Sequence, residues 1–91
     1  MSNPKTIKIK VYADPGHAWA AVKRKSLEKL QIIDKISGYS YQRGATVYLE
    51  EDCDLSVFVN ALKGLGFAVE YIESHTNNRS PIRSYDSFKI S

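Results

Sequence analysis

The stretch from Gly38 to Gly66 constrains the fold most, because it predicts a hairpin that leads directly into an amphipathic helix. Within it, apolar residues recur at the i, i+3, i+4, i+7 spacing that places side chains on one face of a helix: Leu55, Phe58, Val59 and Leu62. A helix with one apolar face needs a partner surface in the core. This stretch therefore predicts a helix that packs on a sheet.

The two ends of this helix are also marked in the sequence. Asp54 is placed to cap the first free amide groups, and Gly64 and Gly66 can adopt the left-handed conformation that ends a helix. The residues before Asp54 put negative charge near the positive end of the helix dipole: Glu50, Glu51 and Asp52.

The residues before the helix predict two paired strands. Val47 and Leu49 alternate with more polar neighbours, which is the period-2 pattern of a half-buried strand. Residues 39–42 are the expected partner strand, and Gly44 lies in the loop between the two.

The loop of this hairpin decides which way Tyr39 and Tyr41 face. A three-residue loop at 42–44, with Gly44 in the positive-φ position, puts both tyrosines on the core face. A two-residue loop at Arg43-Gly44 shifts the register by one and puts both beside Tyr48 on the other face. We favour the first register, because it packs the tyrosines against the apolar stripe of the helix.

The N-terminal part of the chain predicts a second hairpin. Residues 6–13 alternate isoleucine and valine with lysine and tyrosine, as a strand with one buried face does. Asp14-Pro15-Gly16 predicts a type II turn, with Gly16 at positive φ. Residues 17–22 are then the returning strand, and Trp19 is expected in the core.

Two further elements complete the prediction. Ser26 is expected to cap a short helix in which Leu27, Leu30 and either Ile33 or Ile36 face inward, followed by an irregular turn near Gly38. After the central unit, residues 67–72 predict a last strand with three side chains on one face: Phe67, Val69 and Tyr71.

The predicted order, ββαββαβ, indicates an α+β domain over residues 1–73, with an antiparallel sheet and both helices on one face. A ferredoxin-like topology with an added N-terminal strand is the specific expectation. Residues 74–91 are polar and contain Pro81, and we expect them to form a tail that folds back on the domain or mediates contacts with another chain.

Length and composition restrict the classes of function. A chain of 91 residues builds one modest core and leaves little material for a deep active-site cleft. The net charge of +3 permits an acidic partner or nucleic acid without requiring either. No apolar stretch is long enough to cross a membrane, and Cys53 has no second cysteine to pair with, so we expect a cytoplasmic protein. Neighbouring carboxylates disfavour the Cys53 thiolate, which predicts an inert thiol.

One short motif suggests metal chemistry. Asp14-Pro15-Gly16-His17 resembles the motif of zinc-dependent N-acetylmuramoyl-alanine amidases, in which the resemblance implies that His17 is a metal ligand. Glu28 and His75 are the residues that would complete such a site by order. The chain is much shorter than that fold, and Ala18-Trp19 replaces its glycine pair. We therefore expect no catalytic residues, metal or cofactor here, and a zinc-dependent hydrolase is the least favoured of three alternatives.

A second pattern suggests nucleic acid. Residues 43–48 are similar to the RNP1 strand of RNA-recognition motifs, in which exposed aromatic residues of a sheet stack on bases. If one uncovered face of the sheet carries both aromatic and basic side chains, it would be a platform for a single strand. The residues expected on that platform are Lys8, Lys10, Tyr12, Tyr48 and Tyr71.

As a whole, residues 5–73 resemble a group of small accessory proteins of tailed phages and prophages. The likeness lies in three segments: 11–17, VYADPGH; 36–41, ISGYSY; and 47–52, VYLEED. The resemblance leads to no established activity, but it implies a non-enzymatic protein that binds and modulates a host protein, such as a defence factor. The expected contacts are Arg43, Glu50, Glu51, Asp52, Arg79, Arg83 and Tyr85. Separately, an unpaired edge strand or the tail allows self-association.

Overall fold

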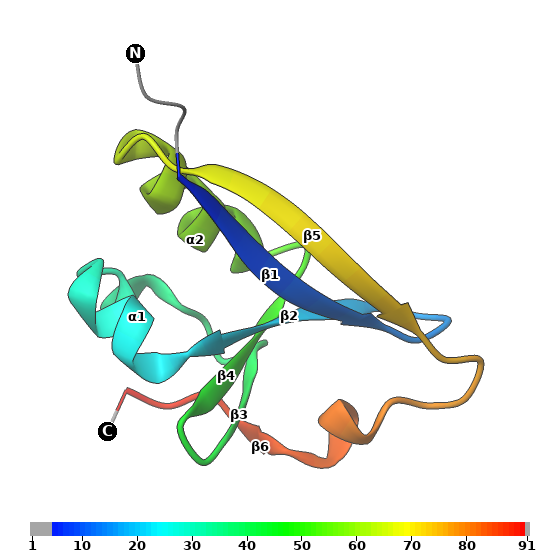
Figure 1. The fold of residues 1–91 in the computed structure, drawn as a ribbon. Coiled ribbons are helices and arrows are strands. Elements are labelled where there is room, and N and C mark those ends of the chain that lie inside the picture. The colour runs from blue at the N-terminus through cyan, green and yellow to red at the C-terminus, as the bar shows by residue number, and fades with distance from the viewer. Residues whose placement is uncertain (1–4, 91) are drawn as a thin grey trace.

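A six-stranded sheet with strand order β5-β1-β2-β4-β3-β6 organises the computed structural model, which describes residues 5–90 (Figure 1). The elements in chain order are β1 (Thr6–Ala13), β2 (Ala18–Lys23), α1 (Arg24–Lys29), a 3-10 helix (Ile33–Lys35), β3 (Tyr41–Arg43), β4 (Thr46–Glu50), α2 (Leu55–Gly64), β5 (Ala68–His75), a second 3-10 helix (Pro81–Ser84) and β6 (Asp86–Ser87). The protein is therefore an α+β domain, with one strand more than the sequence predicts.

The sheet is mixed, so the prediction of an all-antiparallel sheet is wrong. β5 pairs in parallel with β1 over its whole length, from Thr6 opposite Ala68 to Ala13 opposite His75. The reason lies in the connection, because α2 carries the chain back across the sheet before β5 begins. β5 consequently runs in the same direction as β4, and β1 already runs in that direction.

One face of the sheet is covered by both helices, and we call it the covered face. Alternate residues of the central strands point into this core, as the period-2 pattern predicts. Its buried residues come from the strands (Ile9, Val11, Ala18, Ala20, Val22, Val47, Leu49), from α1 (Leu27), from α2 (Phe58, Val59, Leu62), from the connection to β3 (Ile32, Ile36) and from the C-terminal segment (Phe88).

α2 forms where the apolar spacing predicts it, and Gly66, with φ of +89°, follows its C-terminus. The predicted cap is wrong, because the Asp54 side chain accepts no hydrogen bond from the amides of the first turn. Its carboxylate instead accepts hydrogen bonds from the Ser37 amide at 3.1 Å, the Ser37 hydroxyl at 2.7 Å and the Ser40 hydroxyl at 2.5 Å. Asp54 thus ties the start of α2 to the connection before β3.

α1 begins at Arg24, two residues before the predicted cap Ser26, and buries Leu27. It ends after one and a half turns because Gln31 takes a positive φ of 58°. The chain then forms the short 3-10 helix, after which Ile36 is buried while Ile33 is only half-buried. Of the two isoleucines that the sequence leaves open, Ile36 is the core residue.

The β3–β4 hairpin has a register that neither predicted loop gives. Arg43 pairs with Thr46, so the loop is Gly44-Ala45, and Gly44 takes φ of +59° at the first loop position, where a type II′ turn favours glycine. Tyr41 then lies opposite Tyr48, on the face away from the helices. Tyr39 precedes the strand and is 73% exposed, so the expectation that both tyrosines join the core face is wrong.

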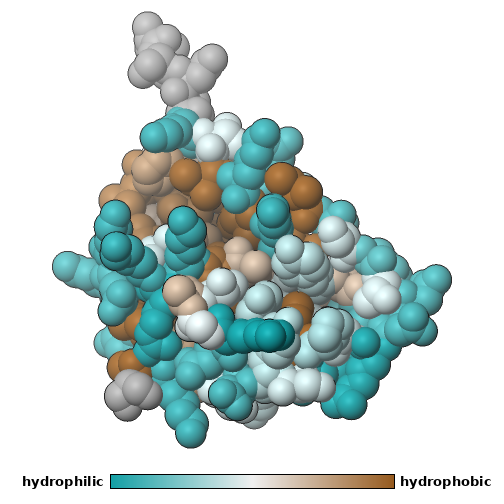
Figure 2. All heavy atoms as spheres, turned by 60° about the horizontal axis from the view of Figure 1, so that its bottom comes forward, coloured by the Kyte–Doolittle hydropathy of each residue, from teal (hydrophilic) through white to brown (hydrophobic). Residues whose placement is uncertain are grey.

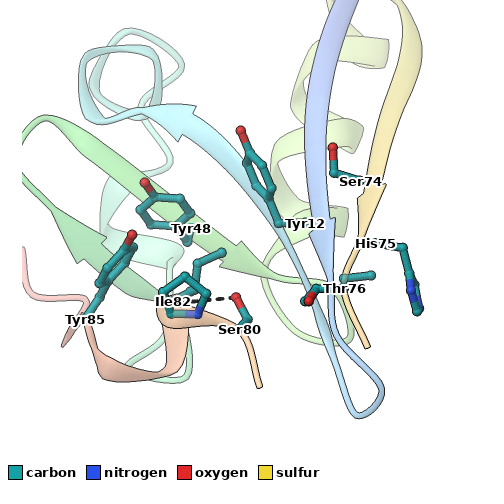
Figure 3. Close-up of a pocket in the computed structure, with 10 residues that line it drawn as sticks. Tyr12, Tyr48, Ser74, His75, Thr76, Ser80, Ile82 and Tyr85 are labelled. Carbon is teal, nitrogen blue, oxygen red and sulfur yellow. Dashed lines mark hydrogen bonds between the residues drawn. The ribbon is translucent and has the colours of Figure 1, made fainter. Parts of the chain in front are cut away.

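The C-terminal segment lies against the domain. β6 pairs with β3, the Phe88 amide donates a hydrogen bond to the Ser40 carbonyl at 2.8 Å, and Ile82 is 4% exposed. Phe88 reaches the covered face, whereas Ile82 packs on the opposite side of the sheet, as the close-up in Figure 3 shows. Among residues 5–90 there is no helix with the length and hydropathy to span a membrane.

Candidate functional site

Among residues 5–90 the second face of the sheet carries no α-helix, and we call it the open face; the short 3-10 helix Pro81–Ser84 of the C-terminal segment packs on part of it. Strand register places one row across it, from Lys10 through Ala21 to Tyr48 and Tyr41. Tyr12 lies on the same face, because successive side chains on β1 point to opposite sides and Tyr12 is two residues from Lys10. Lys8, Lys10, Tyr12 and Tyr48 therefore share this face.

Tyr71 does not belong to this set. It pairs with Ile9, whose side chain is buried in the core of the covered face. Tyr71 thus points to the covered side of the edge strand β5, where it is 47% exposed. The sequence suggests a shared face because both strands alternate, but the pairing of β5 with β1 was needed to align them.

The C-terminal segment crosses part of the open face and leaves a pocket of about 370 Å³ (Figure 3). Tyr12 and Tyr48 rise into it from the sheet, and Tyr85 and Ile82 come from the C-terminal segment. In Figure 3 the three tyrosine hydroxyls point in the same direction, whereas His75 turns away from them. A mostly apolar hollow with a few hydroxyls is suited to a flat ring with polar edges.

The tyrosines of this pocket interact closely. The ring centroids of Tyr48 and Tyr85 lie 5.1 Å apart at an angle of 53°, and the Arg43 guanidinium lies 5.0 Å from the centre of the Tyr85 ring. Burial, together with Tyr85 and Tyr12, raises the pKa of Tyr48 above its usual range. The Tyr48 hydroxyl therefore stays neutral at physiological pH and can donate a hydrogen bond.

Basic side chains extend the open face beyond the pocket. Lys23 pairs with Thr46, which places Lys23 on this face with Lys8 and Lys10. Where the β1–β2 pairing ends at Lys10 and Ala21, a hollow of about 280 Å³ is lined by all three lysines and also by core residues of the covered face, among them Ile9, Val22 and Phe58. Glu70, opposite Lys8, is the acidic residue that β5 adds here. Figure 2, turned so that the bottom of Figure 1 comes forward, shows hydrophilic side chains beside exposed apolar patches.

Asp14 holds the C-terminal segment to the first hairpin. Its carboxylate accepts hydrogen bonds from Arg83 Nε at 2.6 Å and Nη2 at 2.9 Å, and from the Ser80 amide at 3.0 Å. It also accepts hydrogen bonds from the amides of Gly16 and His17, at 2.9 and 3.0 Å. The Arg83 hydrogen bonds, followed by these amides, hold the pKa of Asp14 far below its usual range despite desolvation.

These contacts also correct the predicted turn. Gly16 does not have a positive φ, so the loop is no type II turn. The Asp14 side chain accepts hydrogen bonds from the amides of Gly16 and His17, and the Asp14 amide donates one to the His17 carbonyl at 2.9 Å. These hydrogen bonds close the loop without a positive φ at Gly16. The Arg83 guanidinium lies 5.3 Å from the Trp19 ring centre, so this predicted partner contact is engaged within the protein.

The predicted partner-binding residues do not form one surface. Arg43 and Tyr85 lie together beside the open face, whereas Arg79 is exposed near the first hairpin loop. Glu51 and Asp52 are exposed at the end of β4, and Glu50 is buried there. The Glu50 Oε2 atom accepts hydrogen bonds from the amides of Asp52 and Cys53, each at 2.9 Å.

Negative charge is concentrated at this corner. Desolvation, followed by Asp52 and Glu50, raises the pKa of Glu51. A hydrogen bond with Glu50 is the first cause that raises the pKa of the Cys53 thiol, and burial and the neighbouring carboxylates raise it further. Cys53 is free and exposed, but at neutral pH it carries a protonated thiol, which is a poor nucleophile.

The residues that the amidase resemblance indicates are not brought together. His17 and His75 line different pockets, and Glu28 is exposed on α1. Instead, His17 lies beside Glu50 and Asp52, with one possible ligand atom from each within 4.8 Å of the others. The sequence gives no signal for this set, because the β2–β4 pairing that forms it joins distant parts of the chain.

No family model matches the chain, and neither the curated proteins nor the solved structures include a match to it.

Proposed function

We propose that this protein acts by binding rather than by catalysis, and that its ligand is a single-stranded nucleic acid held on the open face. The observation that carries the proposal is the register of β1, β2 and β4. It gathers Lys8, Lys10, Tyr12 and Tyr48 on the open face, away from α1 and α2. The same register adds Lys23, which the sequence did not single out.

The chemistry of this face suits an unpaired strand. Half-buried tyrosine rings are fixed in place, and stacking on them requires bases that are not already stacked in a duplex. The lysines supply charges for the phosphates, and the pocket beside Tyr12 and Tyr48 has room for a planar ring. Lys8, Lys10 and Tyr12 thus place phosphate contacts and a base contact along β1, and Tyr48 adds a second ring from β4.

The distribution of charge favours one orientation of the ligand. Glu50 lies in the row of Tyr12 and Trp19, near the acidic corner, whereas Lys8 lies toward the other end of β1. Phosphates are attracted to the lysine end and repelled from the acidic end. We therefore expect the single-stranded nucleic acid to run along the face from Lys8 and to end at the tyrosine pocket.

A salt titration tests the proposal. Fluorescence anisotropy with a labelled oligothymidine of about 12 nucleotides, within the range of known single-strand sites, should show an affinity that falls steeply with salt. Lys8→Ala and Lys10→Ala should each lower the slope by about 0.7, the value for one lost phosphate contact on a single strand. Lys63→Ala, on the exposed side of α2, is the matched control and should leave the slope unchanged.

Two outcomes would remove the proposal. One is an absence of binding at low salt. The other is binding that Lys8→Ala and Lys10→Ala weaken no more than Lys63→Ala does, since the contacts would then lie elsewhere.

A protein partner is the second candidate, because within residues 5–90 β5 ends the sheet and has a neighbouring strand on one side only. Its Tyr71 and Ile72 are 47% and 44% exposed, which suits the addition of a strand from another chain. In this alternative the protein is a phage-type accessory protein that occupies a host protein in the cytoplasm, or pairs with a second copy of itself.

Light scattering and pull-down experiments test this alternative. A dimer, or a specific host protein recovered by the wild type and lost with Ile72→Lys, supports it. Lys29→Ala, on α1, is the control. A monomer at all concentrations, together with equal recovery by Ile72→Lys, would contradict it.

For the fold, we propose a ferredoxin-like arrangement with an inserted strand. Without β1 and β6, the remaining order is β5-β2-β4-β3, built from the units β2-α1-β3 and β4-α2-β5. β1 then lies between β5 and β2 rather than at an edge. An experimental structure that fails to superpose these two units on a ferredoxin-like sheet would contradict this assignment.

A further inference from the structure

Another pocket, of about 300 Å³, lies at the acidic corner formed by Glu50, Glu51 and Asp52 and is separate from the tyrosine pocket. His17 enters it from the β1–β2 loop, Glu50 from the end of β4, and Asp52 from the turn that follows. The pairing of Trp19 with Glu50, and the hydrogen bond from the Glu51 amide to the Ala18 carbonyl at 3.1 Å, hold the loop against this turn.

Glu50 is positioned as a ligand before any ion is present. It is 8% exposed, and its Oε2 atom is fixed by the two backbone amides of the turn. This leaves the Oε1 atom beside His17, with 3.6 Å between Oε1 and the His17 Nδ1 atom. A buried carboxylate that is oriented through one oxygen presents the other at a fixed place.

A second observation in the same pocket points to a missing polar partner. Trp19 lines the pocket and is 2% exposed, and its Nε1–H has no acceptor among the described residues. Buried donors are nearly always satisfied, and one that is not indicates an acceptor such as a bound water beside it. A water held by an ion in this pocket would be such an acceptor, so the pocket combines clustered metal ligands with a buried residue whose donor has no partner among residues 5–90.

We propose that His17, Glu50 and Asp52 bind a divalent transition-metal ion of the Zn²⁺ type, with a remaining position open to the pocket. Zinc lies about 2.0–2.2 Å from nitrogen and oxygen ligands, so tetrahedral ligand atoms are about 3.4 Å apart. The 3.6 Å between His17 and Glu50 is close to that separation. The whole set lies within 4.8 Å, and the exposed side chains of His17 and Asp52 can close the difference.

The ligand types decide the class of ion. An imidazole nitrogen favours zinc and its neighbours over Mg²⁺, which prefers oxygen ligands in an octahedral arrangement. Two carboxylates and one neutral imidazole balance the charge of one divalent ion. Cys53 lines the same pocket but lies outside the set of three.

Isothermal titration of the full chain, freed of metal with a chelator, tests the site with zinc chloride and magnesium chloride in turn. We expect one zinc per chain and much weaker magnesium binding. His17→Ala and Asp52→Asn should each weaken zinc binding at least tenfold, since even the loss of a group that only supports a ligand costs about 10- to 100-fold. The matched controls are His75→Ala and Asp34→Asn, which lie outside the pocket and should leave binding unchanged.

Further measurements keep the result decisive. Circular dichroism in chelator checks that each variant is folded, and both substituted side chains are exposed. In the wild type, zinc should shift the NMR signals of the His17 ring and not those of the His75 ring. An absence of zinc binding, equal binding of magnesium, or a shift of His75 alone would overturn the proposal. Oligothymidine binding by His17→Ala should equal that of the wild type, so this site and the open face are tested separately.

Discussion

The two faces of one sheet are closed in different ways. The covered face is sealed by apolar side chains from both helices and by Phe88. The open face is crossed only by the C-terminal segment, which is held by the Asp14–Arg83 ion pair and the Ser80 amide. Apolar packing is non-directional and covers a surface continuously. The hydrogen bonds of Asp14 with Arg83 and Ser80, which we call the polar strap, are directional and hold the segment at a few points only. The covered face therefore holds most of the apolar core, whereas the open face buries Trp19 and Ile82 and leaves other rings and charges accessible.

The C-terminal segment takes part in both faces. Phe88 completes the core under the helices, while Ile82 and Tyr85 form one wall of the tyrosine pocket. The segment thus couples the ligand pocket to the stability of the domain. Changes at its two ends should separate the two roles.

The largest effect is expected at the covered face. Phe88→Ala should lower the free energy of unfolding by about 3–5 kcal/mol, the usual cost of truncating a buried phenylalanine. Phe88 is 5% exposed. Ile90→Ala, two residues away and 56% exposed, is the control and should change the value by less than about 0.5 kcal/mol. Urea denaturation measures both, and equal stability of the two variants would show that the segment does not close the core.

A smaller effect is expected at the open face, on binding. Tyr12→Ala should weaken oligothymidine binding by about 1–3 kcal/mol, the usual value for one lost stacking partner. Tyr71→Ala is the matched control, since it removes a tyrosine from the other side of the sheet. Anisotropy at fixed salt compares them. An equal loss in both variants would contradict the assignment of faces.

The contribution of the Asp14 hydrogen bonds to the free energy of unfolding should depend on pH. Because the pKa of Asp14 is lowered in the folded protein, its contribution to stability is present above its unfolded pKa of about 3.9 and is lost progressively as the pH falls below that value. Urea midpoints of the wild type and Asp14→Asn should differ by a constant amount between pH 7 and about pH 5, and converge in stronger acid. A difference in urea midpoint that grows as the pH falls would contradict a lowered pKa of Asp14 in the folded protein.

The smallest effect is expected for Lys23, at the margin of the open face. Lys23→Ala should lower the salt slope of binding by at most about 0.7, as for one phosphate contact. Lys25→Ala, two residues away on α1 and exposed, is its control. If Lys23→Ala and Lys25→Ala give the same slope as the wild type, the nucleic acid does not extend past Lys10.

Local patterns predicted the elements well. The alternation in residues 6–13 and the apolar spacing in α2 identified their buried faces, because those faces depend on neighbours within the same element. The hairpin register was not predictable in this way. Moving the loop by one residue, to Gly44-Ala45, changes the partner of Tyr41 without changing the pattern of either strand.

Contacts between distant residues account for the rest. Asp14 and Arg83 are 69 residues apart, and nothing near Asp14 indicates that its carboxylate binds a guanidinium. Asp54 has the sequence signature of a helix cap, but the hydroxyls of Ser37 and of the buried Ser40 compete for it. Four of the residues expected on the nucleic-acid platform share a face, whereas Tyr71 does not, because its side depends on the parallel pairing of β5.

Backbone NMR of the full chain during titration with the oligothymidine at low salt tests the central claim most directly. The amide signals of Lys8, Lys10, Tyr12 and Tyr48 should move together, with those of Tyr85 beside them, while the signals of α1 and α2 stay in place. Shifts confined to the helices or to the acidic corner at Glu51 and Asp52, or no shifts at all, would contradict a binding role for the open face.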